Sequence, residues 1–502
     1  MTACLLLTVE AYAIPPMPIT YTVNDVSDAV DNNLLDGQCL TIDNKCTLRA
    51  AVMQANDALD HTVPIIIVVP AGIYNLTIDP AGSDLDDSGD LNLAAPAAGT
   101  PILTISGAGA GVTIIDGNLK DRVFSVEGSR SVAISGVTIR HGVASGSGGG
   151  IYNFGNLTLS DSEVVDNSAA FGAGLENQGT LTVTRVLLSG NIASSTGGGI
   201  YNFGMLSVSQ SLLSDNKATT DGAGIANYGV DSSTLDLVTL SGNKASSYGG
   251  GIYNGATLTI TRSALSSNSA VYHGGGIYST AGATLNISTS TIRDNTGTVG
   301  GGIANSGALF VTNSTVSQNL TVAEGGGIFN DGTSNVYNST IAYNTAGFGS
   351  GLAGYGGGVA NNGTFNVRNS IVAVNYSPAQ GFYDDCMGTV NSYGVNRFLA
   401  GLAGSTAHCT VVQIGSGNHN GLVSLLGLGS LKDNGGPTRT IALLPISNSD
   451  VIDKADAVFG CIDKNSALLT TDQRGRARII GAHCDIGAFE YDPGDIFSNG
   501  FE

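Results

Sequence analysis

One recurring phrase constrains the fold of this 502-residue chain more than any other feature. Between residues 148 and 361, Gly-Gly-Gly-Ile-Tyr-Asn or a close variant precedes a short turn, an alternating apolar segment, an Asn and a polar turn. Apolar anchors mark the units at intervals of 24 to 31 residues: Ile151, Leu175, Ile200, Ile225, Ile252, Ile277, Ile303, Ile328 and Val359. A column of Asn keeps nearly the same period: Asn167, Asn191, Asn216, Asn243, Asn268, Asn295, Asn319, Asn344 and Asn375. Two columns in register predict a solenoid of stacked repeats.

Each unit alternates apolar and polar residues, as in Leu157-Thr158-Leu159-Ser160, which is the pattern of a half-buried β-strand. Leucine-rich repeats have a similar period, but they need a helical or 3₁₀ segment, and glycine runs disfavour a helix. One unit drawn out straight would span roughly 80 Å, so it must fold into several short strands joined by corners. The sequence therefore predicts an all-β fold, a right-handed single-stranded parallel β-helix of the pectin-lyase-like kind.

The repeated residues have structural roles in such a rod. The anchors are expected to point inward as an aliphatic stack, and the glycine runs to form a corner that a Cβ would obstruct. A further Asn column stands two residues after the anchors, where stacked amides can bond from rung to rung, and Ser279 interrupts it. Its members are Asn153, Asn177, Asn202, Asn227, Asn254, Asn305, Asn330 and Asn361.

The net charge disfavours two classes of partner, and the N-terminus indicates an exported protein. The net charge of −20 disfavours nucleic acid and anionic membranes as partners, because both require Lys and Arg to neutralise phosphate. An apolar run precedes Ala11-Tyr12-Ala13, the small-x-small pattern that signal peptidase recognises, so residues 1–13 are expected to be a signal peptide. No other stretch of roughly 20 apolar residues exists, so no transmembrane helix is expected.

Six cysteines remain after residue 13, and an even number in an exported chain predicts disulfides. Sequence alone leaves about fifteen connectivities open. Local pairing would join Cys39 with Cys46, Cys386 with Cys409, and Cys461 with Cys484.

Residues 14–62 are expected to cap the first rung of the rod. Within them, residues 46–59 are predicted to form a helix with Thr47 as N-cap and an apolar face of Leu48, Val52, Ala55 and Leu59. The hexapeptide from Cys46 to Ala51 resembles the Cys-Ser-Leu-Arg-Glu-Ala signature of the CSLREA domain, found at the front of exported β-helical bacterial proteins. Ala50 replaces the Glu that would complete a capping box, which weakens the helix start. The glycine-rich repeats also resemble those of polymorphic outer-membrane proteins.

The period is lost after Pro378, so the β-helix is expected to span residues 63–380 and a separate unit residues 381–491. Segments 449–453, 472–475 and 484–490 resemble a choice-of-anchor C-terminal domain, whose members carry differing surface anchors. Residues 492–502 resemble a terminal tag on exported proteins of some Gram-negative bacteria. These resemblances imply an extracellular or cell-surface location, with anchoring or secretion machinery of the outer membrane as a partner of the C-terminus.

Two groups of residues are candidates for ligand binding. Five aromatic residues follow the anchors and are expected to face outward as an interrupted strip that can stack on a glycan: Tyr152, Tyr201, Tyr253, Tyr278 and Phe329. Four residues place oxygens at alternating positions, as in the first half of a Ca²⁺-binding EF-hand loop: Asp84, Asp86, Ser88 and Asp90. Ala95 stands where that loop has its bidentate Glu, and a solvated acidic loop is the alternative.

No catalytic residue is assigned from the sequence. A polysaccharide lyase or hydrolase needs carboxylates gathered on one face, but Asp166 and Asp215 lie two rungs apart and the pair Arg140-His141 has no carboxylate cluster beside it. The sequence therefore favours a non-catalytic exported protein that acts as an adhesin or binding scaffold for a glycan or other cell-surface ligand. A lyase or hydrolase using one β-face is the alternative, and a passive spacer is a third reading.

Overall fold

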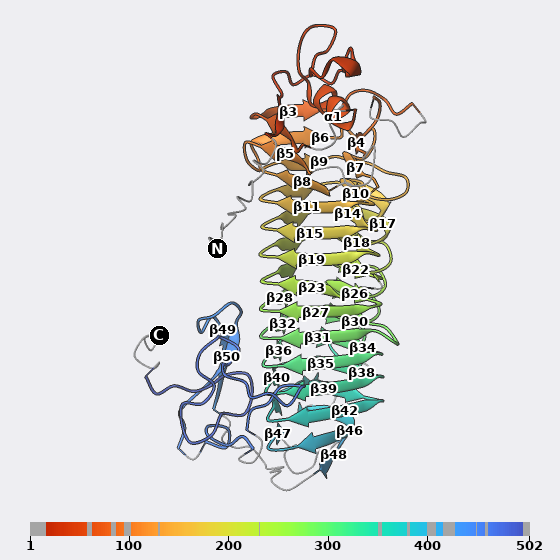
Figure 1. Ribbon diagram of the computed structural model, residues 1–502. Helices are drawn as coiled ribbons and strands as arrows, with labels where there is room; N and C mark the ends of the chain where they lie inside the picture. Colours follow the sequence, from red (N-terminus) through yellow and green to blue (C-terminus); the bar gives the residue numbers. More distant parts are fainter. Residues whose placement is uncertain are drawn as a thin grey trace, which may run out of the picture.

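The computed structural model describes residues 17–57, 63–81, 87–94, 102–128, 131–229, 231–349, 354–378, 382–398, 408–414, 427–447, 449–456 and 460–494. The chain forms a long rod of stacked coils (Figure 1). Helix α1 (Leu48–Asn56) and a 3₁₀ turn (Leu34–Asp36) lie at the N-terminal end, and a C-terminal unit lies beside the other half of the rod. The predicted all-β parallel β-helix is confirmed.

The largest sheet has 26 strands and takes two from most rungs, a short strand that starts at the anchor and a longer one after the turn. Its strands are β1 (Ile19–Thr22), β2 (Ile65–Val69), β4 (Leu91–Leu93), β5 (Leu103–Gly107), β7 (Phe124–Val126), β8 (Ser131–Ser135), β10 (Ile151–Asn153), β11 (Asn156–Ser160), β14 (Leu175–Asn177), β15 (Thr180–Thr184), β18 (Ile200–Asn202), β19 (Met205–Ser209), β22 (Ile225–Asn227), β23 (Ser233–Asp236), β26 (Ile252–Asn254), β27 (Thr257–Thr261), β30 (Ile277–Ser279), β31 (Thr284–Ser288), β34 (Ile303–Asn305), β35 (Ala308–Thr312), β38 (Ile328–Asn330), β39 (Thr333–Tyr337), β41 (Val359–Asn361), β42 (Thr364–Arg368), β46 (Cys386–Tyr393) and β48 (Cys409–Ile414).

A second sheet of 13 strands forms another face of the rod. It consists of β3 (Gly72–Asn75), β6 (Thr113–Asp116), β9 (Thr138–Arg140), β12 (Glu163–Val165), β16 (Leu187–Ser189), β20 (Leu212–Ser214), β24 (Thr239–Ser241), β28 (Ala264–Ser266), β32 (Thr291–Arg293), β36 (Thr315–Ser317), β40 (Thr340–Ala342), β43 (Ile371–Ala373) and β47 (Arg397–Phe398).

A third sheet of seven strands forms the remaining side, and two antiparallel pairs complete the described strands. The third sheet holds β13 (Ser168–Phe171), β17 (Ile192–Thr196), β21 (Lys217–Ala218), β25 (Lys244–Ala245), β29 (Ser269–Ala270), β33 (Thr296–Gly297) and β37 (Leu320–Thr321). The pairs are β44 (Tyr376–Ser377) with β45 (Phe382–Tyr383) and β49 (Leu428–Lys432) with β50 (Thr440–Leu443).

Like residues stack on like residues along the rod. Ile200 pairs in parallel with Leu175 on one side and with Ile225 on the other, and all three are fully buried. The corner before each anchor has glycine at two positions: Gly249 has φ of 62°, and a Cβ on Gly251 would stand 2.7 Å from the carbonyl oxygen of Gly276. Because the same corner recurs before every anchor, successive rungs lie directly over one another.

Both Asn columns form hydrogen-bonded ladders inside the rod. The amide of Asn216 donates to Oδ1 of Asn243 at 3.0 Å, and that of Asn243 donates to Asn268 at 2.9 Å. In the other column, Asn202 donates to Asn227 at 2.8 Å, and Ser279, where the column is interrupted, accepts from Asn254 at 3.3 Å. The structural role predicted for these amides is confirmed.

Thr47 is the N-cap residue of helix α1, as predicted, because its hydroxyl accepts the N–H of Ala50 at 3.1 Å. The predicted apolar face is buried at Leu48, Val52 and Ala55, and Leu59 lies outside the described residues. Figure 1 shows α1 across the first coils. The helix thus covers the open end of the solenoid, which would otherwise be free to pair with other chains.

The sheet runs further at both ends than the expected limits of 63–380. Strand β1 pairs with β2 in parallel, so the chain builds part of a rung before it forms the helix. At the other end, β46 stacks on β41 and β42, and β48 stacks on β46. These rungs lack the glycine phrase, and backbone pairing with the preceding rung is enough to extend the sheet.

The structure forms the three disulfides of the local pairing. Cys39–Cys46 lies in the cap, Cys386–Cys409 joins β46 to β48, and Cys461–Cys484 lies in the C-terminal unit. Each bond therefore staples a part of the chain that lacks the regular repeat.

The C-terminal unit docks on the second sheet through Gln473. Its amide nitrogen donates to the carbonyl of Ser290 at 3.1 Å and to the Thr291 hydroxyl at 2.9 Å, and its Oε1 accepts from Thr315 at 2.6 Å. Ile371 of β43 packs with Phe489 in one apolar cluster. The unit is thus held to the rod by buried polar and apolar contacts.

We expect Gln473→Ala to loosen this docking, because it leaves several buried partners without a hydrogen bond. A cost of about 2 kcal/mol in local opening would raise the rate of limited proteolysis between rod and C-terminal unit roughly thirtyfold. The exposed Asn465 offers a control, since Asn465→Ala should leave the rate unchanged. Equal rates for both variants would contradict this role of Gln473.

Candidate binding surface

The outer corner of the rungs carries a continuous run of aromatic side chains. It is made by Tyr272 and by three columns, which stand one position after each anchor, three positions after the anchor and four positions before the anchor. Neighbouring ring centroids lie 4.6 to 6.3 Å apart from Phe171 to Phe329. We call this set the aromatic ridge: Phe171, Tyr201, Phe203, Tyr228, Tyr248, Tyr253, Tyr272, His273, Tyr278 and Phe329.

Three of the predicted residues lie in the ridge as half-buried rings with one side toward solvent. Tyr201 stacks on Phe171 at 5.3 Å, and Tyr253 lies 5.6 Å from Tyr278. Tyr152 lies one stretch further toward the N-terminus, 5.5 Å from Phe154. Its hydroxyl accepts from the Gln178 amide at 3.2 Å.

Phe329 differs from the expected outward position. Its side chain is only 7% exposed, because the small neighbours Ala304 and Ala360 in the same column let it pack down among them. The ring meets the ridge edge-on at His273, 6.3 Å away. Phe329 thus supports the end of the ridge and offers no face for stacking.

The expected gaps in the strip are filled by residues that the sequence argument missed. Ala226 interrupts the first column, but Tyr228 stacks on Tyr253 at 4.9 Å and reaches Tyr201 at 5.6 Å. Tyr248 widens the ridge beside Tyr253 and stacks on Tyr278 at 5.0 Å. The same period that gives the first column would have found both residues, because each recurs at a fixed offset from its anchor.

Burial raises the pKa of several phenols in the ridge. It raises the pKa of Tyr201 to about 12, with a smaller contribution from the charge of Glu176. Burial also raises the pKa of Tyr228 and of Tyr253. The half-buried His273 has a lowered pKa for the same reason. An ordinary phenol is already neutral at pH 7, so Tyr201, Tyr228 and Tyr253 are uncharged rings with hydroxyl groups that can donate hydrogen bonds.

Two carboxylates lie within the ridge. Glu176 pairs in register between Tyr152 and Tyr201 and accepts from the Gln178 amide at 2.8 Å. Asp221 lies at the corner and accepts the N–H of Tyr248 at 3.1 Å. Burial raises the pKa of both carboxyl groups, so the ridge combines aromatic faces with poorly solvated acidic groups.

A groove of about 330 Å³ lies between the rod and the C-terminal unit. Phe310 and Asn286 line it from the rod, and Asp463 and Lys464 line it from the other side. The Lys464 ammonium lies 5.0 Å from the centre of the Phe310 ring, so the most prominent aromatic face in the groove already holds a cation.

The predicted Ca²⁺ loop is only partly described. Asp84 and Asp86 lie outside the described residues. Asp90 is buried and lies 3.6 Å from Arg122, and the Ser88 hydroxyl accepts from the N–H of Ala81 at 3.4 Å. Within the described ranges, no three His, Cys, Asp or Glu side chains gather as metal ligands.

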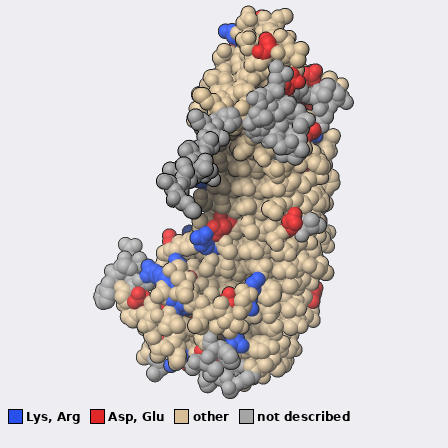
Figure 2. Space-filling model, in the orientation of Figure 1, with Lys and Arg blue, Asp and Glu red and all other residues tan. Residues whose placement is uncertain are grey.

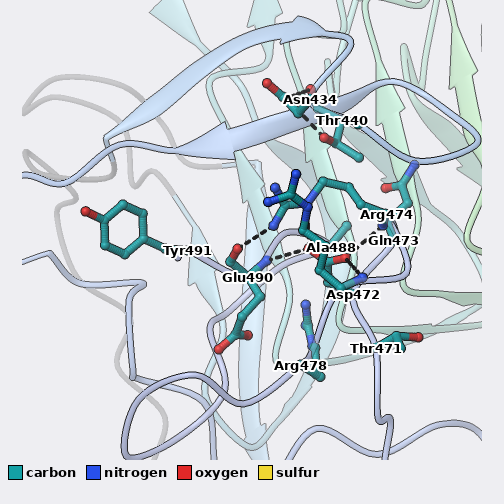
Figure 3. A network of polar contacts seen from close by, with 12 residues as sticks. Asn434, Thr440, Thr471, Asp472, Gln473, Arg474, Arg478, Ala488, Glu490 and Tyr491 are labelled. Atoms are coloured by element: carbon teal, nitrogen blue, oxygen red, sulfur yellow. Dashed lines mark hydrogen bonds and ion pairs between the residues drawn. The ribbon is translucent and has the colours of Figure 1, made fainter. Parts of the chain in front are cut away.

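A carboxylate cluster with basic partners occurs in the C-terminal unit, inside segments 472–475 and 484–490. Figure 3 shows Arg474 between Asp472, at 2.7 Å, and the backbone carbonyl of Glu490, also at 2.7 Å. Burial raises the pKa of Glu490 to about 8 and that of Asp485 to about 6. These side chains are almost completely buried, so the cluster holds the loops together and presents no acid to a substrate.

Charge is sparse on the visible face of the rod. Figure 2 shows Lys and Arg mainly on the C-terminal unit and Asp and Glu scattered from the N-terminal end to that unit, while uncharged residues cover most of the rod. Among the described residues, no helix is long and apolar enough to span a bilayer.

Comparisons with known proteins agree with the repeat. Residues 237–255, most of one unit, match the Chlamydia polymorphic membrane protein repeat. Among solved structures, the chain is similar to the A-module of mannuronan C-5 epimerase AlgE6 from Azotobacter vinelandii, at 14% identity, covering 78% of this chain and 98% of that one, with a TM-score of 0.35. No curated protein matches the chain. One segment of the rod is therefore similar to the Chlamydia polymorphic membrane protein repeat, and the distant epimerase likeness carries no functional argument.

Proposed function

We propose that the protein is an exported, non-catalytic β-helix that binds a glycan through the aromatic ridge and acts as an adhesin or binding scaffold. One observation carries the proposal: the rings of Tyr201, Tyr228, Tyr253 and Tyr278 follow one another without a gap along the rod. Half-buried aromatic rings stack well on apolar faces of sugars, and their polar tips can hydrogen-bond to hydroxyl groups. Because rungs repeat every ~4.8 Å, the ridge suits an extended polymer lying along the axis.

Export and surface location form part of the same proposal. The three disulfides suit an oxidising compartment outside the cytosol. We assign residues 1–13 to a signal peptide, 14–62 to a CSLREA-like cap and 381–491 to a choice-of-anchor-like domain. The tail of residues 492–502 would then contact the outer-membrane anchoring or secretion machinery. Residues 1–13 and most of the tail lie outside the described residues.

Glycan binding is tested by a glycan array with the full chain, followed by calorimetry on the best oligosaccharide. We expect Tyr253→Ala to weaken binding roughly tenfold, because it removes a stacking face at the centre of the ridge. Tyr376→Ala is the matched control, since Tyr376 is 40% exposed on β44 outside the ridge. Equal affinity of Tyr253→Ala and the wild type would contradict binding at the ridge.

The alternative function, a polysaccharide lyase or hydrolase on a β-face, is tested with the same ligands. An assay for new reducing ends or unsaturated products should give no signal if the protein only binds. Turnover that survives Tyr253→Ala would place the function elsewhere on the molecule.

A further inference from the structure

The three columns that form the aromatic ridge contain acidic residues but neither Lys nor Arg. Its three columns, followed over the nine repeats, hold four carboxylates: Glu176, Asp221, Glu324 and Asp331. Glu176 and Asp221 follow the rod two rungs apart, a separation of roughly 10 Å, and Glu324 lies four rungs beyond Asp221, at roughly 20 Å. The acidic groups thus stand at whole multiples of the rung spacing.

Asp221 lies at the centre of the ridge. Besides accepting the N–H of Tyr248, its charge adds to burial in raising the pKa of the Tyr228 and Tyr253 phenols. Within the described part of the chain, Asp221 forms no ion pair with Lys or Arg. A half-buried carboxylate that faces aromatic rings and lacks a basic partner is a favourable place for a cation.

The protein itself places a cation on this surface at its N-terminal end. The guanidinium of Arg122 lies over the Tyr152 ring, 5.2 Å from its centre, and its charge acts on Glu176 in the next rung. Further along the rod, the ridge offers the same combination of ring and carboxylate without a side chain that supplies the charge. The net charge of −20 also attracts cationic ligands from a distance.

We propose that the ligand of the ridge is a glycan that carries protonated primary amines, a polymer of glucosamine-type sugars. The sugar rings stack on the tyrosines, and an amine pairs with Asp221, with a further amine reaching Glu324 along the rod. This proposal rests on glycan binding at the ridge and adds the charge of the ligand. A neutral glycan would gain the stacking alone and would leave the carboxylates without a counter-charge.

The test compares three six-sugar chains by calorimetry with the full protein: β-1,4-linked glucosamine, its fully N-acetylated form, and β-1,4-linked glucose. We expect the glucosamine chain to bind about tenfold more tightly than the other two. Asp221→Asn should remove this preference, because it takes away the charge that pairs with the amine. Asp215→Asn, which removes the same charge from an exposed site outside the ridge columns, should keep it.

Four results would overturn the proposal. Equal affinity for the glucosamine and N-acetylated chains would leave glycan binding standing and remove the amine. Equal losses in Asp221→Asn and Asp215→Asn would reduce the preference to overall charge. Polylysine binding as tight as that of the glucosamine chain, and insensitive to Tyr253→Ala, would assign the surface to a basic peptide. If all three sugar chains fail to bind while folding is intact, the proposed function fails with the inference.

Discussion

Replacing Arg49 with Met is expected to lower the free energy of unfolding of the N-terminal part of the rod by about 3 to 5 kcal/mol. Arg49 is fully buried, pairs with Asp28 at 2.6 Å and donates to the carbonyl of Gly89 at 2.7 Å. Without it, the Asp28 carboxylate stays buried and keeps the N–H groups of Thr77 and Ile78 as donors, but it has lost the cation that balances its charge. Urea denaturation followed by circular dichroism measures the loss.

A matched variant separates burial from charge. Arg185 pairs with Asp161 at 2.6 Å, but both side chains are about half exposed to screening solvent, so Arg185→Met should shift the urea midpoint little. Adding Asp28→Asn to Arg49→Met should recover part of the loss, because the buried charge disappears. Similar midpoints for Arg49→Met and Arg185→Met would contradict this account of the cap.

Asn243→Ala is expected to destabilise the middle of the rod by about 4 kcal/mol. The Asn243 amide donates to Leu213 O at 3.0 Å and to Asn268 Oδ1, and its Oδ1 accepts from the backbone and side-chain nitrogens of Asn216. Alanine leaves all four partners without this bond inside the rod, and each orphaned buried group costs about 1 to 3 kcal/mol.

The neighbouring Lys244 provides the control for Asn243. Its side chain is exposed on β25, so Lys244→Ala should shift the urea midpoint little. If the Asn243 and Lys244 variants unfolded at the same urea midpoint, the Asn ladder would not contribute to the stability of the rod.

The regular part of the fold follows from the sequence because each structural role repeats. Ile225 is an anchor because its neighbours one unit away are Ile200 and Ile252, and stacked rungs place all three in one buried row. The Asn columns follow for the same reason. Terminal rungs such as β1 and β46 give no such signal, since they depend on backbone pairing with a neighbour, which any alternating segment can provide.

The site follows from the sequence only in part. The outward row of tyrosines could be read from the period, but its continuity depends on Tyr228, which comes from an adjacent column and bridges Tyr201 and Tyr253. Phe329 is buried because its neighbours in the column are alanines, and periodicity alone does not predict this packing. The docking of Gln473 joins residues 158 positions apart, and nothing local in the sequence indicates that partner.

The most direct test of the account is a crystal structure of the full protein soaked with the tightest-binding oligosaccharide. The account predicts sugar density along the ridge, over Tyr201, Tyr228, Tyr253 and Tyr278, with the chain parallel to the rod axis. Density in the groove beside Phe310 and Lys464, with a bare ridge, would contradict it.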